Sequence, residues 1–348
     1  MKKATLIITL MLATATTFAQ EATAPTETPL EISGSGDLYY KYDFAKVPNI
    51  GTSFATDQNS VSLGMLDIAL KKTKGKTSFV GEVSFGPRGQ YQSIPNGDGI
   101  DENSFHIQNL YATYEVSDKL SLTAGYMGTF IGYEVISPVS NFHYSTSYLF
   151  TNGPFQNAGI KANYKISEKF GAMVGLFNDS WNKYSADSVK GLNAIGGQLS
   201  YASGPVSAYL NFMDGSVSGS IVDLTATFQF SEKFKLGLNA ADYSNEDKVG
   251  YTGVALYPSY ALTNAFSLGL RAEYFEAKKG SVEGVTVYGI DGDQSVTAFT
   301  LSGNYKVGSL TVIPEFRLDS NSDKYFSDSD LMATKSASQA TLAVVYAF

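Results

Sequence analysis

Charged side chains recur at every second position in several stretches of this sequence. Within residues 266–274, Arg271 and Glu273 alternate with the apolar Leu270 and Ala272. If such a stretch is a β-strand, successive side chains point to opposite faces, so the charges gather on one face. A face that mixes carboxylates with amines can line a water-filled space and select solutes by size and charge.

The same assignment along the whole chain gives ten acids and eight bases on one face. If the apolar face meets lipid, a Lys or Arg placed there would cost about 2–4 kcal/mol at the midplane, which favours a wet interior for the charged face. A polar plug that fills the interior would explain the same face, and this alternative stays open. The candidate lining residues are Asp37, Lys41, Asp67, Glu82, Glu115, Lys161, Lys165, Asp223, Lys235, Arg271, Glu273, Lys306, Glu315 and Arg317, with Asp43, Lys71, Asp179 and Asp319 on the same face.

The longest stretch without alternation, residues 130–156, is rich in aromatic side chains and carries a single charge. Loops of this length without regular structure usually have a function. We expect it to fold into the interior and narrow it, with an external cap as the alternative. Few charges and many rings would suit uncharged or sugar-like solutes. The candidate constriction residues are Tyr133, Glu134, Phe142, His143, Tyr144 and Tyr148.

Hydrolytic chemistry would need a nucleophile, a base and an orienting group within hydrogen-bond distance. His143 lies near Ser140, Ser145 and Ser147 in the sequence, whereas His106 is separate. Neighbours within one loop rarely satisfy that geometry, and the chain has no nucleophile-elbow motif. We therefore predict that the protein is not an enzyme, and a lipid hydrolase is the least favoured function.

Metal and cofactor sites are also poorly supported. The chain has no cysteine and two histidines, which removes thiolate and multi-histidine centres. The last of three acidic loops has oxygen ligands at a spacing loosely like an EF-hand, but Lys324 occupies the position where that loop needs glycine. We expect solvated acidic loops and no resident metal or cofactor, although weak divalent binding stays open. The acidic loops contain Asn96, Asp98, Asp101 and Glu102, then Asp291 and Asp293, then Asp319, Asn321, Asp323, Asp328 and Asp330.

The N-terminus has the layout of a secretory signal peptide. Lys2 and Lys3 precede an apolar run over residues 4–15, and Thr17 and Ala19 supply small residues for cleavage. The run is too short for a spanning helix, which needs about 20 apolar residues. We expect residues 1–19 to be removed, residues 20–29 to form a flexible lead-in, and residues 30–348 to form one domain. The net charge of −8 makes nucleic acid an unsuitable partner.

From residue 30 onward, segments of about 11 residues alternate apolar with polar or small side chains, and turn residues separate them. No segment shows the 3.6-residue period of a helix. Short turns such as residues 167–170 and 231–234, both Ser-Glu-Lys-Phe, alternate with long polar loops. This pattern predicts an all-β transmembrane antiparallel barrel of 16 strands, within a range of 14 to 18. The strands are expected at 31–45, 59–71, 77–86, 105–116, 120–129, 157–166, 170–180, 191–202, 205–214, 220–230, 234–244, 250–262, 266–276, 295–306, 309–319 and 337–348.

Two of these strands contain a proline, Pro258 and Pro314. Proline cannot donate to a strand ladder, and a closed barrel has no free edge on which to place it. Each proline therefore predicts a β-bulge or an error of one strand pair.

The last strand alternates Leu342, Val344, Tyr346 and Phe348, and the chain ends on the aromatic ring. The terminal strands of outer-membrane barrels resemble it closely, and in those proteins it serves as the insertion signal. A soluble sandwich could end on an amphipathic strand, but 16 such strands exceed one sandwich.

Several stretches resemble one family, the OmpL-like β-barrel porins that are frequent in the Bacteroidota. The likeness is carried by residues 134–138 (EVISP), 141–145 (NFHYS), 153–155 (GPF), 32–34 (ISG) and 39–42 (YYKY). It implies an outer-membrane porin of a Gram-negative bacterium and brings no catalytic residues. The expected partners are outer-membrane lipid, the barrel-assembly machinery and small hydrophilic solutes, with a homotrimer possible at this size. The alternative function is a closed or plugged structural or adhesive barrel.

Overall fold

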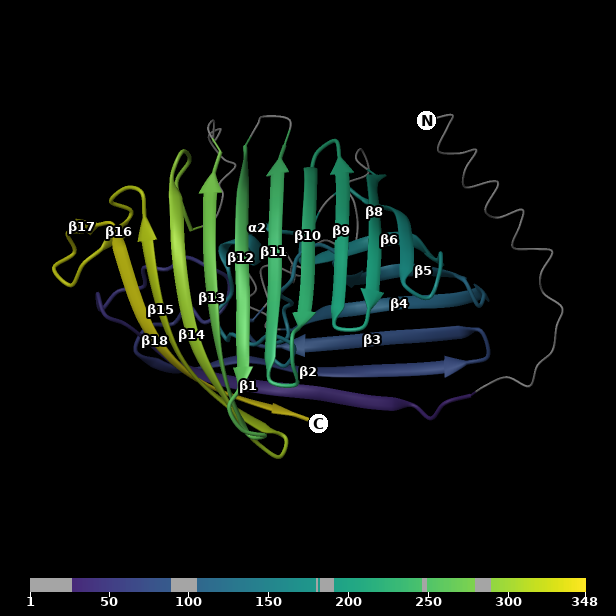
Figure 1. The fold of residues 1–348 in the computed structure, drawn as a ribbon, viewed down its shortest axis with the longest axis horizontal. Coiled ribbons are helices and arrows are strands. Elements are labelled where there is room, and N and C mark those ends of the chain that lie inside the picture. Colours follow the sequence, from purple (N-terminus) through teal and green to yellow (C-terminus); the bar gives the residue numbers. More distant parts are fainter. Residues whose placement is uncertain (1–26, 89–104, 180, 182–190, 246–248, 279–288) are drawn as a thin grey trace.

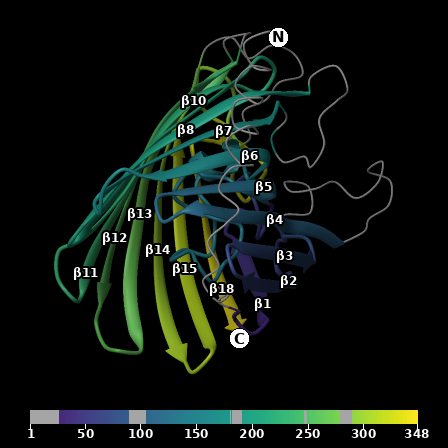
Figure 2. The same ribbon diagram turned by 90° about the vertical axis from the view of Figure 1, so that its right-hand side faces the viewer.

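The computed structural model describes residues 27–88, 105–179, 181, 191–245, 249–278 and 289–348. Sixteen antiparallel strands form one closed barrel in chain order, and β18 returns to pair with β1 (Figures 1 and 2). The strands are β1 (Glu31–Asp43), β2 (Ser60–Lys74), β3 (Thr77–Phe85), β4 (Phe105–Ser117), β5 (Leu120–Gly128), β6 (Gln156–Lys165), β7 (Phe170–Asn178), β8 (Leu192–Ser203), β9 (Val206–Gly215), β10 (Gly219–Gln229), β11 (Phe234–Ser244), β12 (Gly250–Ala261), β13 (Phe266–Ala277), β14 (Ser295–Val307), β15 (Leu310–Asn321) and β18 (Ser336–Ala347).

The predicted fold class and strand count are confirmed. A short hairpin of β16 (Phe326–Ser327) and β17 (Ala333–Thr334) lies outside the barrel sheet, in the connection between β15 and β18. Within the described part of the chain, no helix has the length and apolarity to cross a membrane. The predicted signal peptide, residues 20–26 of the lead-in and the acidic loop at residues 96–102 lie outside the described residues. Residues 27 and 28 bond to the end of β2, where Thr28 N–H donates to the Thr73 carbonyl.

One end of the barrel carries the short connections, the start of β1 and the C-terminus, and we call it the turn end. Its tight turn between β2 and β3 contains Gly75 at φ 59°, a left-handed conformation that glycine adopts without strain. Phe348 closes the ladder there, because its backbone N–H and carbonyl both bond to Gly34. The opposite end carries the long connections, and we call it the loop end.

The expectation of a bulge at each proline was wrong. The register of β11 with β12 continues through Pro258, and that of β15 with β18 continues through Pro314. Pairs are missing beside each proline only on its other neighbour, β13 and β14 respectively, and the register resumes unchanged. The reason is that a strand residue bonds to one neighbour only, so a missing N–H weakens one ladder and leaves the other complete.

The outer surface of the barrel is apolar. Leu63, Leu199 and Leu301 are among many large side chains that point outward and are exposed. Near the turn end the outward positions carry aromatic rings, as expected where a barrel meets the lipid interface. These rings belong to Tyr164, Phe170, Phe230, Tyr260, Tyr305, Tyr346 and Phe348.

Candidate functional site

Residues 129–155, which connect β5 to β6, fold into the barrel; we call them the inner loop. Its single helix, α2 (Tyr148–Asn152), lies inside the ring of strands behind β11 and β12 (Figure 1). Ser147 begins this helix, because its hydroxyl accepts the Phe150 N–H. Tyr144, Tyr148 and Leu149 are buried, so the part of the inner loop around α2 is enclosed by the barrel.

Arg271 on β13 holds the first half of the inner loop. Its guanidinium forms a buried ion pair with Glu134 at 2.8 Å and donates to the carbonyls of Ser145 and Thr146. The second oxygen of Glu134 accepts both the backbone N–H and the hydroxyl of Ser147. One strand residue therefore ties together two parts of the loop that are eleven or more residues apart.

Two strand carboxylates receive pairs of backbone amides from the inner loop. Glu315 on β15 accepts the N–H groups of Tyr144 and Ser145 at 2.9 and 3.1 Å. Glu273 on β13 accepts those of Tyr148 and Leu149 at 3.0 and 2.9 Å. Hydrogen bonds to an ionised carboxylate are stronger than neutral ones, and the second pair also places a negative charge at the N-terminus of α2, where it is favoured.

Two tyrosine hydroxyls complete the attachment. Tyr148 donates to Asp319, which Arg317 also holds through two bonds of 2.8 and 2.9 Å. Tyr144 donates to Asp37 on β1. Burial beside these carboxylates raises the pKa of both tyrosines, so both phenols stay protonated and act as donors.

Four lumen-facing glycines accept side chains of the inner loop. A Cβ atom at any of them would come closer than 3 Å to a loop side chain. The wall therefore has four shallow recesses, and the loop is shaped to fit them. The pairs are Gly196 with Phe130, Gly237 with Tyr133, Gly253 with Leu149, and Gly269 with Phe142.

Toward the loop end, a cluster of apolar side chains lines part of the lumen. Phe177, Met213 and Tyr251 from the wall form one buried cluster with Ile131 and Leu149 of the inner loop. The gap that remains between loop and wall there is a cavity of only about 10 Å³. The apolar cluster therefore leaves little space between the inner loop and this part of the wall.

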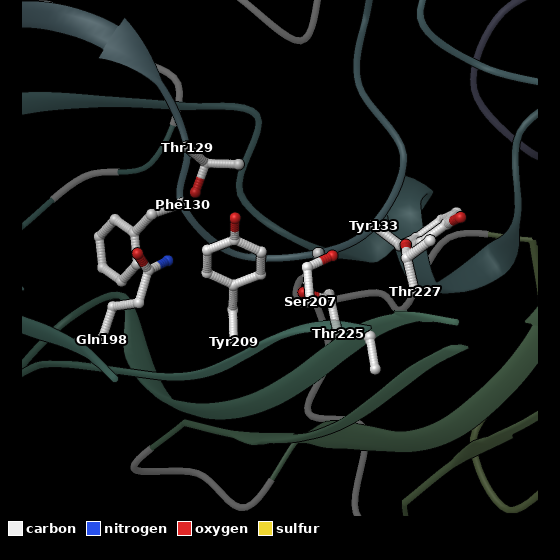
Figure 3. Close-up of a pocket in the computed structure, with 10 residues that line it drawn as sticks. Thr129, Phe130, Tyr133, Gln198, Ser207, Tyr209, Thr225 and Thr227 are labelled. Carbon is white, nitrogen blue, oxygen red and sulfur yellow. The ribbon is translucent and has the colours of Figure 1, made fainter. Parts of the chain in front are cut away.

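Toward the turn end, the space beneath the inner loop is hollow. One cavity of about 300 Å³ lies between the loop and the lumen faces of β8, β9 and β10, which we call the neutral wall. Figure 3 shows Phe130, Tyr133 and Tyr209 with Gln198 and several hydroxyl groups around it. Two further cavities of about 380 and 400 Å³ border the short turns and contain lysines.

The structure places the predicted lining residues in two groups. Asp37, Arg271, Glu273, Glu315 and Arg317, on β13, β15 and β1, all contact the inner loop; we call the lumen faces of β13, β14, β15, β18 and β1 the charged wall. Asp223 receives the Gly132 N–H from the loop. Residues that border the turn-end cavities are Glu115, Lys165, Lys235 and Lys306.

The other predicted lining residues contact neighbouring strands or a connection. Asp67 accepts from Ser35 and Glu82 accepts from Asn109, whereas Lys41 donates to the carbonyl of Thr56 in the connection between β1 and β2. Lys161 on β6 forms no ion pair within the described residues. The predicted constriction residues Tyr133, Glu134, Phe142, His143, Tyr144 and Tyr148 all lie in the inner loop inside the barrel.

The hydrolase geometry is absent around His143. Its Nδ1 lies 2.7 Å from Ser302 of β14, not from a serine of its own loop, and the Ser302 hydroxyl donates to Glu315. Ser302 therefore lies between His143 and Glu315, and its hydroxyl proton points to the Glu315 carboxylate. All three side chains are buried. Burial and the nearby Arg271 and Arg317 hold the pKa of His143 well below its ordinary value. This histidine is a neutral positioning group in the loop attachment.

Two features of the site were not predicted from the sequence: Arg88 and the four glycines that form the recesses. Arg88 follows β3 and stacks on the rings of Phe54 and Tyr144, beside Asp37 at 3.6 Å. Nothing in its local sequence marks it. The four recess glycines did carry a signal, because glycine at a lumen-facing strand position often marks a close approach. Among the described residues, no group of three or more His, Cys, Asp or Glu could hold a metal ion.

Comparison with known proteins shows that the sequence matches one family and that the fold is similar to many solved β-barrel structures. Residues 29–348 match the family described as "Putative beta-barrel porin-2, OmpL-like". No curated protein sequence matches. The fold is similar to that of an anion-selective porin from Comamonas acidovorans, at 15% identity over 92% of this chain and 99% of that one, with a TM-score of 0.61. It is also similar to that of OmpF of Salmonella typhi in complex with daunomycin, at 12% identity over 93% of this chain and 100% of that one, with a TM-score of 0.63. OmpT of Vibrio cholerae is similar at 12% identity over 94% of this chain and 99% of that one, with a TM-score of 0.57.

Proposed function

The chain belongs to the OmpL-like family of beta-barrel porins, and we propose that solutes cross its barrel by passive diffusion between the inner loop and the neutral wall. The observation that carries this proposal is the uneven attachment of the inner loop, because most of its hydrogen bonds to the strands go to the charged wall. The loop is fixed to the charged wall, and the 300 Å³ cavity lies on its other side.

The attachment changes the role of the lining charges. Arg271, Glu315 and Glu273 are occupied by bonds to the inner loop. Their charges are compensated, so a passing solute meets little of their field. Selection along the neutral wall then depends on width and on neutral hydrogen-bonding groups. Lys235 and Lys306, which line a turn-end cavity without acidic residues, supply a weak preference for anions.

A plugged barrel is the second candidate, favoured by the apolar cluster at the loop end. Both functions use the same fold and the same loop attachment. They differ in whether the apolar cluster blocks the lumen or leaves a path for water and ions.

Single-channel recording of the refolded mature protein in a planar bilayer tests the proposal. We expect stepwise conductance that rises with salt, and the reversal potential in a salt gradient would report the ion preference. A folded, heat-modifiable barrel without conductance would contradict diffusion and support the plugged barrel. Neither candidate requires a catalytic step from the His143–Ser302 pair.

We further propose that the protein is exported and that its signal peptide is cleaved after Ala19. The barrel-assembly machinery of a Gram-negative bacterium would then recognise the terminal strand and insert the barrel into the outer membrane. Leu342 and Tyr346 face outward on that strand and Phe348 closes the barrel, which supports the insertion role. A Vibrio cholerae OmpT structure is described as a trimer, and we propose a homotrimer here. Mass determination in detergent tests the trimer.

A further inference from the structure

The cavity against the neutral wall has a lining without charge. It is bordered by residues 129–133 of the inner loop and by β8, β9 and β10. Its volume of about 300 Å³ is at the lower end of the roughly 300–1,000 Å³ of small-molecule sites. It can therefore enclose a small solute but not an extended chain.

The polar groups of the lining are neutral and several are free. Ser207, Tyr209 and Thr225 make no side-chain hydrogen bond to any residue that the structure describes, while the Gln198 amide donates to Asn211 and leaves its oxygen unused. Hydroxyls both donate and accept. These groups can follow the alternating donors and acceptors of a solute that carries several hydroxyls.

The aromatic rings supply the apolar side of the same site. Tyr209 is 39% exposed and packs against no other ring in the described chain. Phe130 and Tyr133 are held firmly, since Phe130 fills the recess at Gly196 and Tyr133 stacks on Tyr257 at 4.5 Å. Figure 3 shows Tyr209 beside Phe130, with Ser207 and Thr225 farther along the same wall. Fixed rings next to free hydroxyls match a ligand that has an apolar C–H face and a polar rim.

The charge distribution argues against ions at this position. The only charged side chain on the described lumen faces of β8, β9 and β10 is Asp223, and it is occupied by Gly132, Asn211 and Asn239. An ionic ligand would lose hydration without gaining a partner of opposite charge, which is costly. A neutral ligand avoids that cost.

We infer that the cavity formed by Phe130, Gln198, Ser207, Tyr209 and Thr225 is a binding site for a small uncharged saccharide of one or two rings. The site lies on the proposed route along the neutral wall, so the inference rests on the proposed function and names a substrate class for it. Saccharide at this position would occupy the route and reduce the ion current.

The test uses the refolded full-length mature protein, with glucose and maltose as neutral probes and glucose 6-phosphate as the charged one. Ion current through single channels is recorded as each sugar is added, and saturation-transfer NMR on the protein in detergent measures binding without any need for conduction. Tyr209→Leu is the test variant, and Tyr111→Leu, on β4 and outside the cavity, is the matched control. Heat-modifiable migration shows that each variant is folded.

We expect saturable binding and current block by at least one neutral sugar, and weaker effects of the phosphate. Tyr209→Leu should raise the half-saturating concentration about tenfold, the size expected for losing one ring contact and one hydrogen bond, whereas Tyr111→Leu should not. Conducting channels without saturable sugar binding would overturn the inference and leave diffusion intact. Sugar binding without conductance would keep the site and contradict the proposed route. Equal effects of the two substitutions would also overturn the assignment to this cavity.

Discussion

The charged wall and the neutral wall line the same lumen, but they differ in how many hydrogen bonds they make to the inner loop. The charged wall offers Glu273, Glu315 and Arg271, and each makes two or more hydrogen bonds to the loop. On the neutral wall, Asp223 accepts the Gly132 N–H and Thr227 bonds to the Tyr133 hydroxyl, and this wall also borders a cavity. The comparison shows that lumen charges in this barrel hold the inner loop in place, and it supports our proposal that the solute passes along the uncharged face.

Loss of Arg271 should give the largest effect. Arg271→Met leaves Glu134 buried without its ionic partner and removes the Arg271 hydrogen bonds to the Ser145 and Thr146 carbonyls, of which Thr146 keeps Arg317 as a donor. Breaking a buried ion pair in this way typically costs about 3–5 kcal/mol. We expect a large fall in the free energy of unfolding and, in channels that still fold, a higher and noisier conductance. Lys161→Met is the matched control, because it removes a lumen-facing cation that has no ion pair in the described chain. Equal losses of stability in both variants would mean that the bonds from Arg271 to the inner loop add nothing beyond the loss of a lumen-facing cation.

The two amide-binding carboxylates allow a sharper comparison within the charged wall. Glu315→Gln and Glu273→Gln keep shape but remove the charge, and each should cost about 1.5–3 kcal/mol of charge-assisted bonding. Hydrogen exchange should accelerate at Tyr144 and Ser145 in the first variant and at Tyr148 and Leu149 in the second. Uniform acceleration across the loop in both variants would show that the carboxylates act only through overall stability.

The smallest effect concerns pH. The pKa of His143 is held well below its ordinary value of 6.5 in the folded state by burial. As pH falls below 6.5 the unfolded chain takes up a proton that the folded chain does not, so stability is lost by up to about 1.4 kcal/mol per pH unit in that window. Arg271, Arg317 and, through Ser302, Glu315 face this ring. The unfolding free energy at pH 7.5 and 5.0 should differ less in His143→Gln than in the parent. An identical difference in the two proteins would show that folding does not shift the pKa of His143.

The strands could be predicted from sequence because their alternation is local. In residues 234–240, for example, each side chain's face follows from its position alone, and the bounds of β11 at 234–244 agree with the prediction. The partners of the inner loop could not be predicted in this way. Glu134 and Arg271 are 137 residues apart, and only closure of the barrel brings them together.

The prolines were misread for a related reason. A strand residue bonds to one neighbour, and sequence does not show which neighbour Pro258 would have served. The contacts of the lumen-facing charges could not be predicted from the sequence either. Period-two alternation placed Glu315 and Lys235 on the same face, but whether a charge meets the loop or a cavity depends on its height and its strand.

The difference between the walls is tested most directly by cysteine substitution, because the parent chain has no cysteine. Ser207→Cys lies in the cavity on β9, and Ser302→Cys lies beneath the inner loop on β14, fully buried. Single-channel current is recorded while a charged, water-soluble thiol reagent is added. We predict an abrupt fall in current for Ser207→Cys and no change for Ser302→Cys. Block at Ser302→Cys with none at Ser207→Cys would place the route on the charged wall and contradict the account.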